Sequence, residues 1–166
     1  MVPVTIAKLG LDSASNAYVV LLQERDGARV LPIWIGRPEA ESIAMQLSGV
    51  KHERPMTHDL CHAVITGLGA TLRRVLVTRV HQGTFFAELH LERGGAPVIV
   101  DARPSDSIAI ALRLDAPIYV AEALLAGELE DGLPEPAGRD DDTLSAEKLQ
   151  RHLEQLRPED FGKFTL

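Results

Sequence analysis

The sequence predicts an α+β fold, built as a twisted, mainly antiparallel sheet with flanking helices. Apolar segments with a two-residue alternation follow one another through turn residues such as Asp26-Gly27 and Gln82-Gly83, which is typical of antiparallel hairpins. Groups of these segments are followed by helical patterns with acidic residues in the first turn. The length of 166 residues fits one domain of about 150 residues.

The N-terminal part is expected to form three strands and a helix. Residues 2–8 alternate weakly, residues 17–23 are apolar and β-branched, and residues 29–35 follow the Asp26-Gly27 turn. Gly36 ends the third strand. Pro38 suits a first helical position, and Gly49 is a plausible end for that helix.

A second helix is expected from Thr57, a good N-cap residue, to Gly67 or Gly69. Another group of strands follows, and a third helix then begins near Ser105 or Asp106. The expected segments after the second helix are strands at 71–80, 84–91 and 97–102, the third helix, a short strand at 117–120 and a short helix at 121–126.

The chain contains a faint internal echo. A strand, an Arg-Pro pair and a helix with Ser-Ile-Ala occur at residues 33–44 and again at residues 98–109. The echo either reflects two similar β-β-α halves or is a coincidence in common helix-start chemistry.

Composition excludes several classes of protein. A single cysteine rules out an intramolecular disulfide framework. No apolar run approaches the roughly 18 residues that a membrane-spanning helix needs. The first eleven residues contain Lys8 and resemble a strand, not a signal peptide, so a cytoplasmic protein without membrane contact is expected.

Charge is distributed unevenly along the chain. Residues 1–115 hold 12 Lys/Arg and 12 Asp/Glu, whereas residues 116–166 hold 5 Lys/Arg and 12 Asp/Glu. We therefore expect a folded domain at 1–126, an acidic linker at 127–144 and a C-terminal helix and tail at 145–166. The lack of a basic excess disfavours a passive nucleic-acid binder, but an enzyme needs only a local positive patch.

Two features near residue 60 allow a simpler interpretation than catalysis. His58 and His62 have the spacing of the zinc-binding H-E-x-x-H motif. Asp59 replaces its glutamate with a shorter side chain, and no third ligand has a helpful spacing. A capped helix start, with His58 near the surface and His62 partly packed, explains the pattern better. Cys61 is expected to be a buried structural thiol.

Three Arg-Pro pairs, at 37–38, 54–55 and 103–104, each precede an expected helix with acidic residues near its start. Arginine and free helical N–H groups suit phosphate, and carboxylates suit Mg²⁺ or Mn²⁺. Metal-assisted phosphodiester hydrolysis uses both sets of groups. The alternative is that these residues only cap the helices and pair with one another.

Three segments resemble the signatures of the bifunctional nuclease domain family, long known as a domain of unknown function. They are Leu-Pro-Ile-Trp-Ile-Gly at 31–36 with Glu-Ala at 39–40, Arg-Pro-Met-Thr-His-Asp-Leu at 54–60, and Asp-Ala-Arg-Pro-Ser-Asp-Ser-Ile-Ala at 101–109. The similarity runs in order over about residues 2–126. It implies a twisted antiparallel sheet with flanking helices, a homodimer or higher homo-oligomer, and nuclease activity on RNA or DNA.

These observations predict a low-specificity nuclease acting with Mg²⁺ or Mn²⁺. The alternative is a non-catalytic oligomeric protein that binds a small anion or a protein partner through the same helix starts. Asp101 and Asp106 are the expected metal ligands, because a strand end and the next helix start can point two carboxylates toward one concave place. The candidate catalytic residues are Asp101, Arg103 and Asp106, with Glu39, Arg54, His58 and Asp59 as second contributors.

Overall fold

The computed structural model describes residues 1–12 and 17–126 of the chain. Seven strands in this part form one sheet in the order β3-β2-β1-β7-β4-β5-β6. All neighbouring strands are antiparallel except the parallel pair β4 and β7, so the predicted α+β class is confirmed. The strands are β1 (Val2–Asp12), β2 (Ala17–Glu24), β3 (Val30–Ile35), β4 (Ala70–His81), β5 (Thr84–Arg93), β6 (Ala96–Ala102) and β7 (Ile118–Val120).

The two halves of the sheet share one arrangement. Strands β1, β2 and β3 lead into helix α1 (Arg37–Leu47), and strands β4, β5 and β6 lead into helix α3 (Pro104–Arg113). An Arg-Pro pair lies at the start of both helices. The internal echo therefore marks two corresponding strand-to-helix junctions, each after three antiparallel strands.

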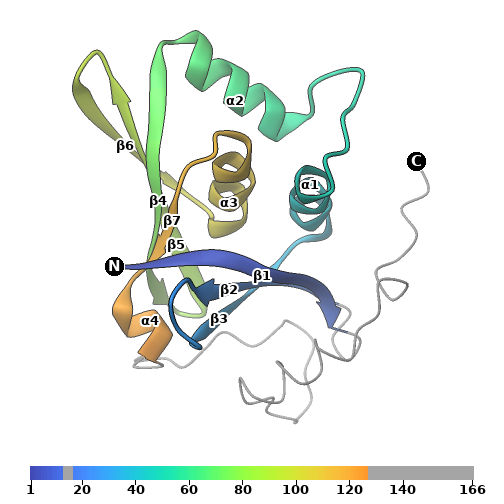
Figure 1. The fold of residues 1–166 in the computed structure, drawn as a ribbon, viewed down its shortest axis with the longest axis vertical. Helices are drawn as coiled ribbons and strands as arrows, with labels where there is room; N and C mark the ends of the chain where they lie inside the picture. The colour runs from blue at the N-terminus through green and yellow to red at the C-terminus, as the bar shows by residue number, and fades with distance from the viewer. Residues whose placement is uncertain (13–16, 127–166) are drawn as a thin grey trace.

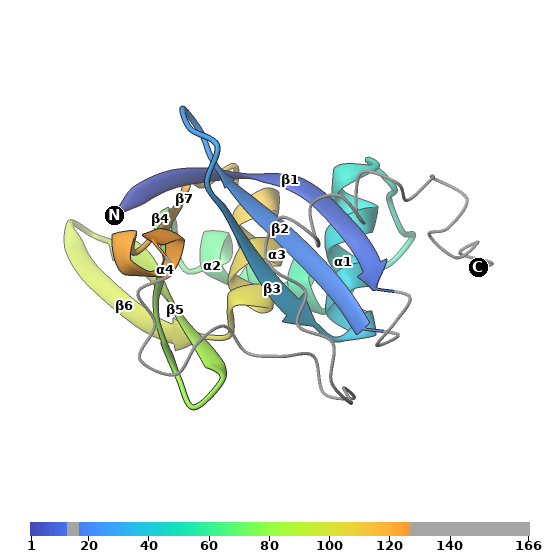
Figure 2. The ribbon, with the colours of Figure 1, turned by 90° about the horizontal axis from the view of Figure 1, so that it is seen from below.

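The sheet is strongly twisted, and three helices cover one of its sides. In Figure 1, β1 crosses the view nearly horizontally while β4 runs nearly vertically. Helices α1, α3 and α2 (Thr57–Gly67) lie together on one side of the sheet, and Figure 2 shows them behind the diagonal β1–β3 strands. The short helix α4 (Glu122–Ala126) lies apart from them, against β3.

The main core lies between the sheet and helices α1 and α3. Ile43 of α1 and Ile108 of α3 have no exposed surface, and both pack into the same apolar cluster as Val20 and Val75 of the sheet. Burying each such side chain contributes about 1.5–3 kcal/mol. The core therefore holds the starts of α1 and α3 in a fixed relation.

Helix α2 is bound differently from its neighbours. None of its residues is fully buried, and Leu60 and Val64 are among the exposed apolar side chains. Its inner side packs on the core through Cys61 and Ile65. Cys61 packs on the core as expected of a structural thiol, but it is only partly buried.

Two helices begin earlier than expected. Helix α2 has Met56 as its N-cap residue, because the Asp59 carboxylate reaches back and accepts the Met56 backbone N–H at 2.9 Å. Helix α3 has Arg103 as its N-cap and begins at Pro104, so Ser105 and Asp106 lie inside its first turn. The acidic linker and the C-terminal helix expected after residue 126 lie outside the described residues.

Candidate functional site

The starts of three helices meet around one pocket of about 260 Å³. Glu39 and Ser42 come from the first turns of α1, His58 from the start of α2, and Arg103 and Asp106 from the start of α3. The three Arg-Pro segments, distant in the sequence, thus place side chains at one location. Pro38, Glu41, Met45, Met56 and Thr57 complete the lining.

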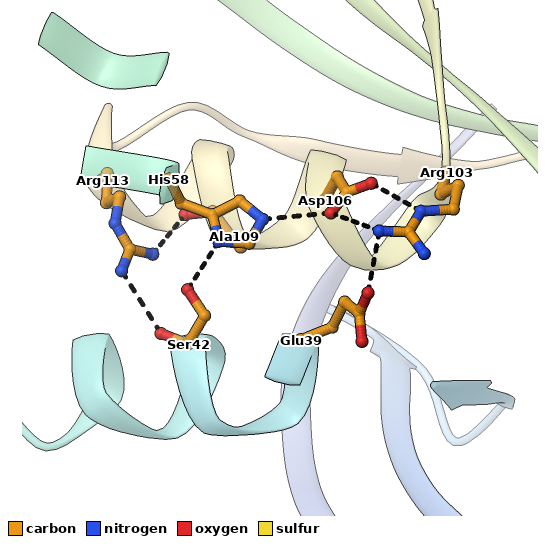
Figure 3. Close-up of polar contacts among 7 residues, drawn as sticks. All are labelled: Glu39, Ser42, His58, Arg103, Asp106, Ala109 and Arg113. Carbon is orange, nitrogen blue, oxygen red and sulfur yellow. Dashed lines mark hydrogen bonds and ion pairs between the residues drawn. The ribbon is translucent and has the colours of Figure 1, made fainter. Parts of the chain in front are cut away.

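A guanidinium links two carboxylates at the pocket. The Arg103 Nε donates to Asp106 Oδ2 at 2.7 Å, and its Nη2 lies 3.1 Å from Asp106 Oδ1 and 2.8 Å from Glu39 Oε1 (Figure 3). Gly36 allows this arrangement, because a Cβ at that position would lie 2.3 Å from Glu39 Oε2. The Nη1 atom of Arg103 has no hydrogen-bond partner among the described residues, so it can donate to a ligand.

His58 connects the same carboxylate to a hydroxyl on another helix. Its Nε2 lies 3.0 Å from Asp106 Oδ1, and its Nδ1 lies 2.8 Å from the Ser42 Oγ. The imidazole is only 12% exposed. Figure 3 shows Ser42, His58 and Asp106 in one line that continues through Arg103 to Glu39.

The electrostatics keep Asp106 ionised. Burial works to raise its pKa, but the hydrogen bonds from Arg103 and His58 together outweigh burial and hold the pKa below its ordinary value. The same contact with Asp106 raises the pKa of Arg103. At neutral pH the pocket therefore holds an ionised carboxylate against both a guanidinium and an imidazole.

Asp59 supports the site from behind. Its Oδ1 accepts from the Nε of Arg113 at 2.5 Å, and the Arg113 side chain is only 6% exposed. Arg113 also donates to the Ala109 carbonyl at 2.9 Å and lies 3.5 Å from the Ser42 carbonyl. The Asp59–Arg113 pair joins α2 to α3 and positions the helix that carries His58.

The structure separates the predicted site residues into two sets. Glu39, His58, Arg103 and Asp106 line the pocket. Asp59, Arg54 and Asp101 do not: Asp59 faces Arg113, Arg54 is exposed in the connection between α1 and α2, and Asp101 is exposed on the edge strand β6, opposite Glu88 of β5.

The expected metal pair is not assembled. Asp101 is outside the pocket, and both carboxylate oxygens of Asp106 are engaged by Arg103 and His58. Residues 1–12 and 17–126 contain no group of three His, Cys, Asp or Glu residues that could hold a metal ion. The donor set does not fit a resident Mg²⁺ or Mn²⁺ ion.

Ser42 is the pocket residue that the sequence did not reveal as functional. Its only signal was the internal echo, in which it corresponds to Ser107. The two serines differ in their surroundings: Ser42 contacts His58, whereas the fully buried Ser107 Oγ has no hydrogen-bond partner in the described part of the chain. What distinguishes them is His58, which helix α2 places beside Ser42.

The fold and pocket define an α+β domain with a polar site at converging helix starts, where arginine, histidine and carboxylate side chains lie together. The chain belongs to the bifunctional nuclease domain family, whose model matches residues 20–130. This confirms the resemblance seen in the three sequence signatures.

Curated relatives show two levels of similarity. An uncharacterized protein of Mycobacterium tuberculosis is 42% identical over 164 residues, covering 95% of this chain and 96% of the relative. Bifunctional nuclease 2 of Arabidopsis thaliana is 33% identical over 115 residues, covering 67% of this chain. This chain matches only 35% of the length of that plant protein.

In residues 1–12 and 17–126, no helix has both the length and the apolar character needed to cross a membrane.

Proposed function

We propose that this protein is a low-specificity nuclease that hydrolyses phosphodiester bonds of RNA, DNA or both. One observation carries the proposal: Arg103, whose Nη1 has no partner among the described residues, borders a pocket that also holds the His58–Asp106 pair. Arginine suits phosphate binding, and a histidine held by a carboxylate suits proton transfer. Membership of the family and the names of the plant relatives support this class of reaction.

Each pocket residue has a distinct role in the proposal. Arg103 binds a non-bridging phosphate oxygen and balances the negative charge that develops during cleavage. Glu39 and Asp106 hold the guanidinium in place. His58 accepts and returns a proton, and Asp106 fixes its orientation.

A requirement for Mg²⁺ or Mn²⁺ is a separate part of the proposal. Magnesium often binds through substrate phosphates and water, with one or two protein carboxylates. Glu39 and Glu41 border the pocket but are paired with Arg103 and Arg37, so the ion would arrive with the substrate phosphate. A metal ion would supply positive charge at the phosphate, in addition to that of Arg103.

A non-catalytic anion- or partner-binding protein is the second candidate. The favouring observation is that Glu39, Arg103 and Asp106 satisfy one another, as they would in a purely structural network. In both cases we propose a cytoplasmic homo-oligomer, and the two candidates differ only in whether phosphodiester bonds are broken.

Cleavage assays on the full chain test the proposal. A labelled single-stranded RNA and a supercoiled plasmid are incubated with the protein in Mg²⁺, Mn²⁺ or EDTA. We expect cleavage of at least one substrate, and a loss of at least about 100-fold in Asp106→Asn, the size typical of removing a group needed for proton transfer. Loss of cleavage in EDTA would support the metal requirement.

Glu92→Gln is the matched control, because Glu92 forms an exposed ion pair with Arg73 away from the pocket. It should cleave like the unsubstituted protein. The unfolding temperature of each variant is measured in parallel. No cleavage under any condition would favour the non-catalytic candidate, and full activity in a folded Asp106→Asn would show that this pocket is not the catalytic site.

A further inference from the structure

We propose that Ser42 is a nucleophile toward phosphorus, activated by His58 and Asp106. This deepens the nuclease proposal and rests on it for the substrate class, a phosphodiester. The observation is the linear contact of three side chains from three helices: Ser42 Oγ to His58 Nδ1 at 2.8 Å, and His58 Nε2 to Asp106 Oδ1 at 3.0 Å (Figure 3). The order hydroxyl, imidazole, carboxylate is that of an activated-serine hydrolase.

The partners of the ring fix where its protons lie. An ionised carboxylate only accepts hydrogen bonds, so the His58 Nε2 that faces Asp106 carries a hydrogen. In the neutral imidazole the other nitrogen then has a free lone pair. The Ser42 hydroxyl therefore donates to His58 Nδ1, and this is the bond along which its proton leaves.

Ser42 can reach a substrate only through the pocket. Ser42 is 6% exposed, and it lines the cavity together with Arg103. Arg103 borders the same cavity, so a phosphate that it binds would lie in the space that Ser42 also borders. The limited exposure also removes bulk water from the hydroxyl, which strengthens its electrostatic interactions.

The reaction proceeds in two balanced steps. Ser42 Oγ attacks phosphorus, its proton passes to His58 Nδ1, and the bond from phosphorus to the leaving nucleoside oxygen breaks as that oxygen takes the proton from His58. Water then attacks the phosphoserine and gives a proton to His58 Nδ1. Ser42 Oγ leaves and recovers that proton, so one diester and one water give a phosphomonoester and an alcohol.

A purely structural role makes a different prediction. If the Ser42–His58 contact only joins α1 to α2, the hydroxyl has ordinary reactivity and its removal lowers only the stability of the fold. An activated serine reacts with phosphorus electrophiles, and that reaction needs the imidazole. Chemical labelling therefore separates the two roles without any nucleic acid.

The test treats the full-length protein with a fluorophosphonate probe and locates the adduct by intact mass and peptide mapping. We expect one adduct at Ser42, which is absent in Ser42→Ala and reduced at least about 100-fold in rate in His58→Gln. Ser48→Ala is the control, because Ser48 is exposed at the end of the same helix and should not affect labelling. Circular dichroism confirms that each variant is folded.

No adduct at Ser42 in the folded protein overturns the proposal. So does a Ser42→Ala variant that cleaves RNA or DNA at the unsubstituted rate, a result that leaves the nuclease function intact. Labelling at Ser42 that depends on His58, without cleavage of either nucleic acid, supports the activated serine and contradicts the nuclease function.

Discussion

At the scale of single residues, Asp59 and Asp106 both lie near helix starts but have different roles. Asp106 borders the pocket, whereas Asp59 holds the buried Arg113 and accepts the Met56 N–H. Removing Asp59 leaves a buried cation without its partner and an uncapped helix. We expect Asp59→Ala to lower the free energy of unfolding by about 2–4 kcal/mol, measured by urea denaturation.

The pH dependence of this stabilisation has a definite sign. The hydrogen bond from Arg113, with a further one from the Met56 N–H, lowers the pKa of Asp59 in the folded state. Its stabilisation is complete above the unfolded pKa of about 3.9 and is lost as the pH falls through the folded value. The difference in the free energy of unfolding between the unsubstituted protein and Asp59→Asn should therefore be largest near neutral pH and shrink below about pH 4. A difference that stays constant well below about pH 4 would contradict the assignment.

The metal pair expected from the sequence is Asp101 and Asp106, but only Asp106 lines the pocket. Asp101 lies on β6 outside the pocket lining, so we expect Asp101→Asn to change cleavage less than about threefold, against about 100-fold for Asp106→Asn. Cleavage rates of both variants with Mg²⁺ provide the measurement. Equal losses in the two variants would restore the pair as a functional unit.

The difference between these residues shows where sequence reasoning stops at this scale. Of the seven residues that the sequence suggested, four line one pocket, because helix-start chemistry is local: Glu39, His58, Arg103 and Asp106. The direction of Asp101 depends on the register of β6 with β5, and the role of Ser42 depends on α2 packing beside α1. Neither the direction of Asp101 nor the role of Ser42 can be predicted from a short segment of sequence.

At the scale of elements, the junction between α2 and β4 offers a matched pair of glycines. Gly69 has a φ of +70°, whereas Gly67 ends the helix at an ordinary φ, and a Cβ would meet no atom within 4 Å at either position. Gly69→Ala should destabilise the protein by about 1–2 kcal/mol through backbone strain alone. Gly67→Ala should stabilise it by about 0.5–1 kcal/mol, because alanine loses less conformational freedom in a helix. Thermal unfolding of both variants measures the contrast, and a shift in the same direction would refute the argument.

Elements were more predictable than their arrangement. Turn residues and alternation located the strands within a few residues, since these signals lie within each hairpin. The short strand β7 was expected at 117–120, but local signals could not give its place in the sheet. It lies between β1 and β4, antiparallel to one and parallel to the other, and its position joins the two halves of the sheet. The pairing of β7 with β1 and β4 depends on the assembled core and not on signals within one hairpin.

At the scale of the whole molecule, the core and the pocket are complete within the described part ending at Ala126. The apolar cluster and the three helix starts all lie before that residue. We expect a chain ending at Ala126 to unfold cooperatively in urea and to retain the activity of the full chain. Loss of cooperative unfolding in the shortened chain alone would show that residues 127–166 contribute to the folded domain.

The sheet ends at β6, and this edge leads to a prediction about self-association. Val98, Ile99 and Val100 are exposed, Ile99 by 60%, and β6 has no second neighbour in the described sheet. Apolar edge strands pair readily with another chain. Antiparallel pairing of two copies about Ile99 would place Val98 of one copy opposite Val100 of the other, an apolar cross-strand contact on a two-fold axis.

We therefore expect light scattering at micromolar protein to give about twice the 18.1 kDa of one chain, or a higher multiple. Ile99→Lys should shift the mass toward a single chain, because it places two ammonium groups together on the axis, where like charges directly opposite each other repel. Val50→Lys is the control: Val50 is similarly exposed but lies in the connection after α1, away from β6. A single-chain mass for the unsubstituted protein would rule out self-association, and an unchanged oligomer in a folded Ile99→Lys would move the interface away from β6.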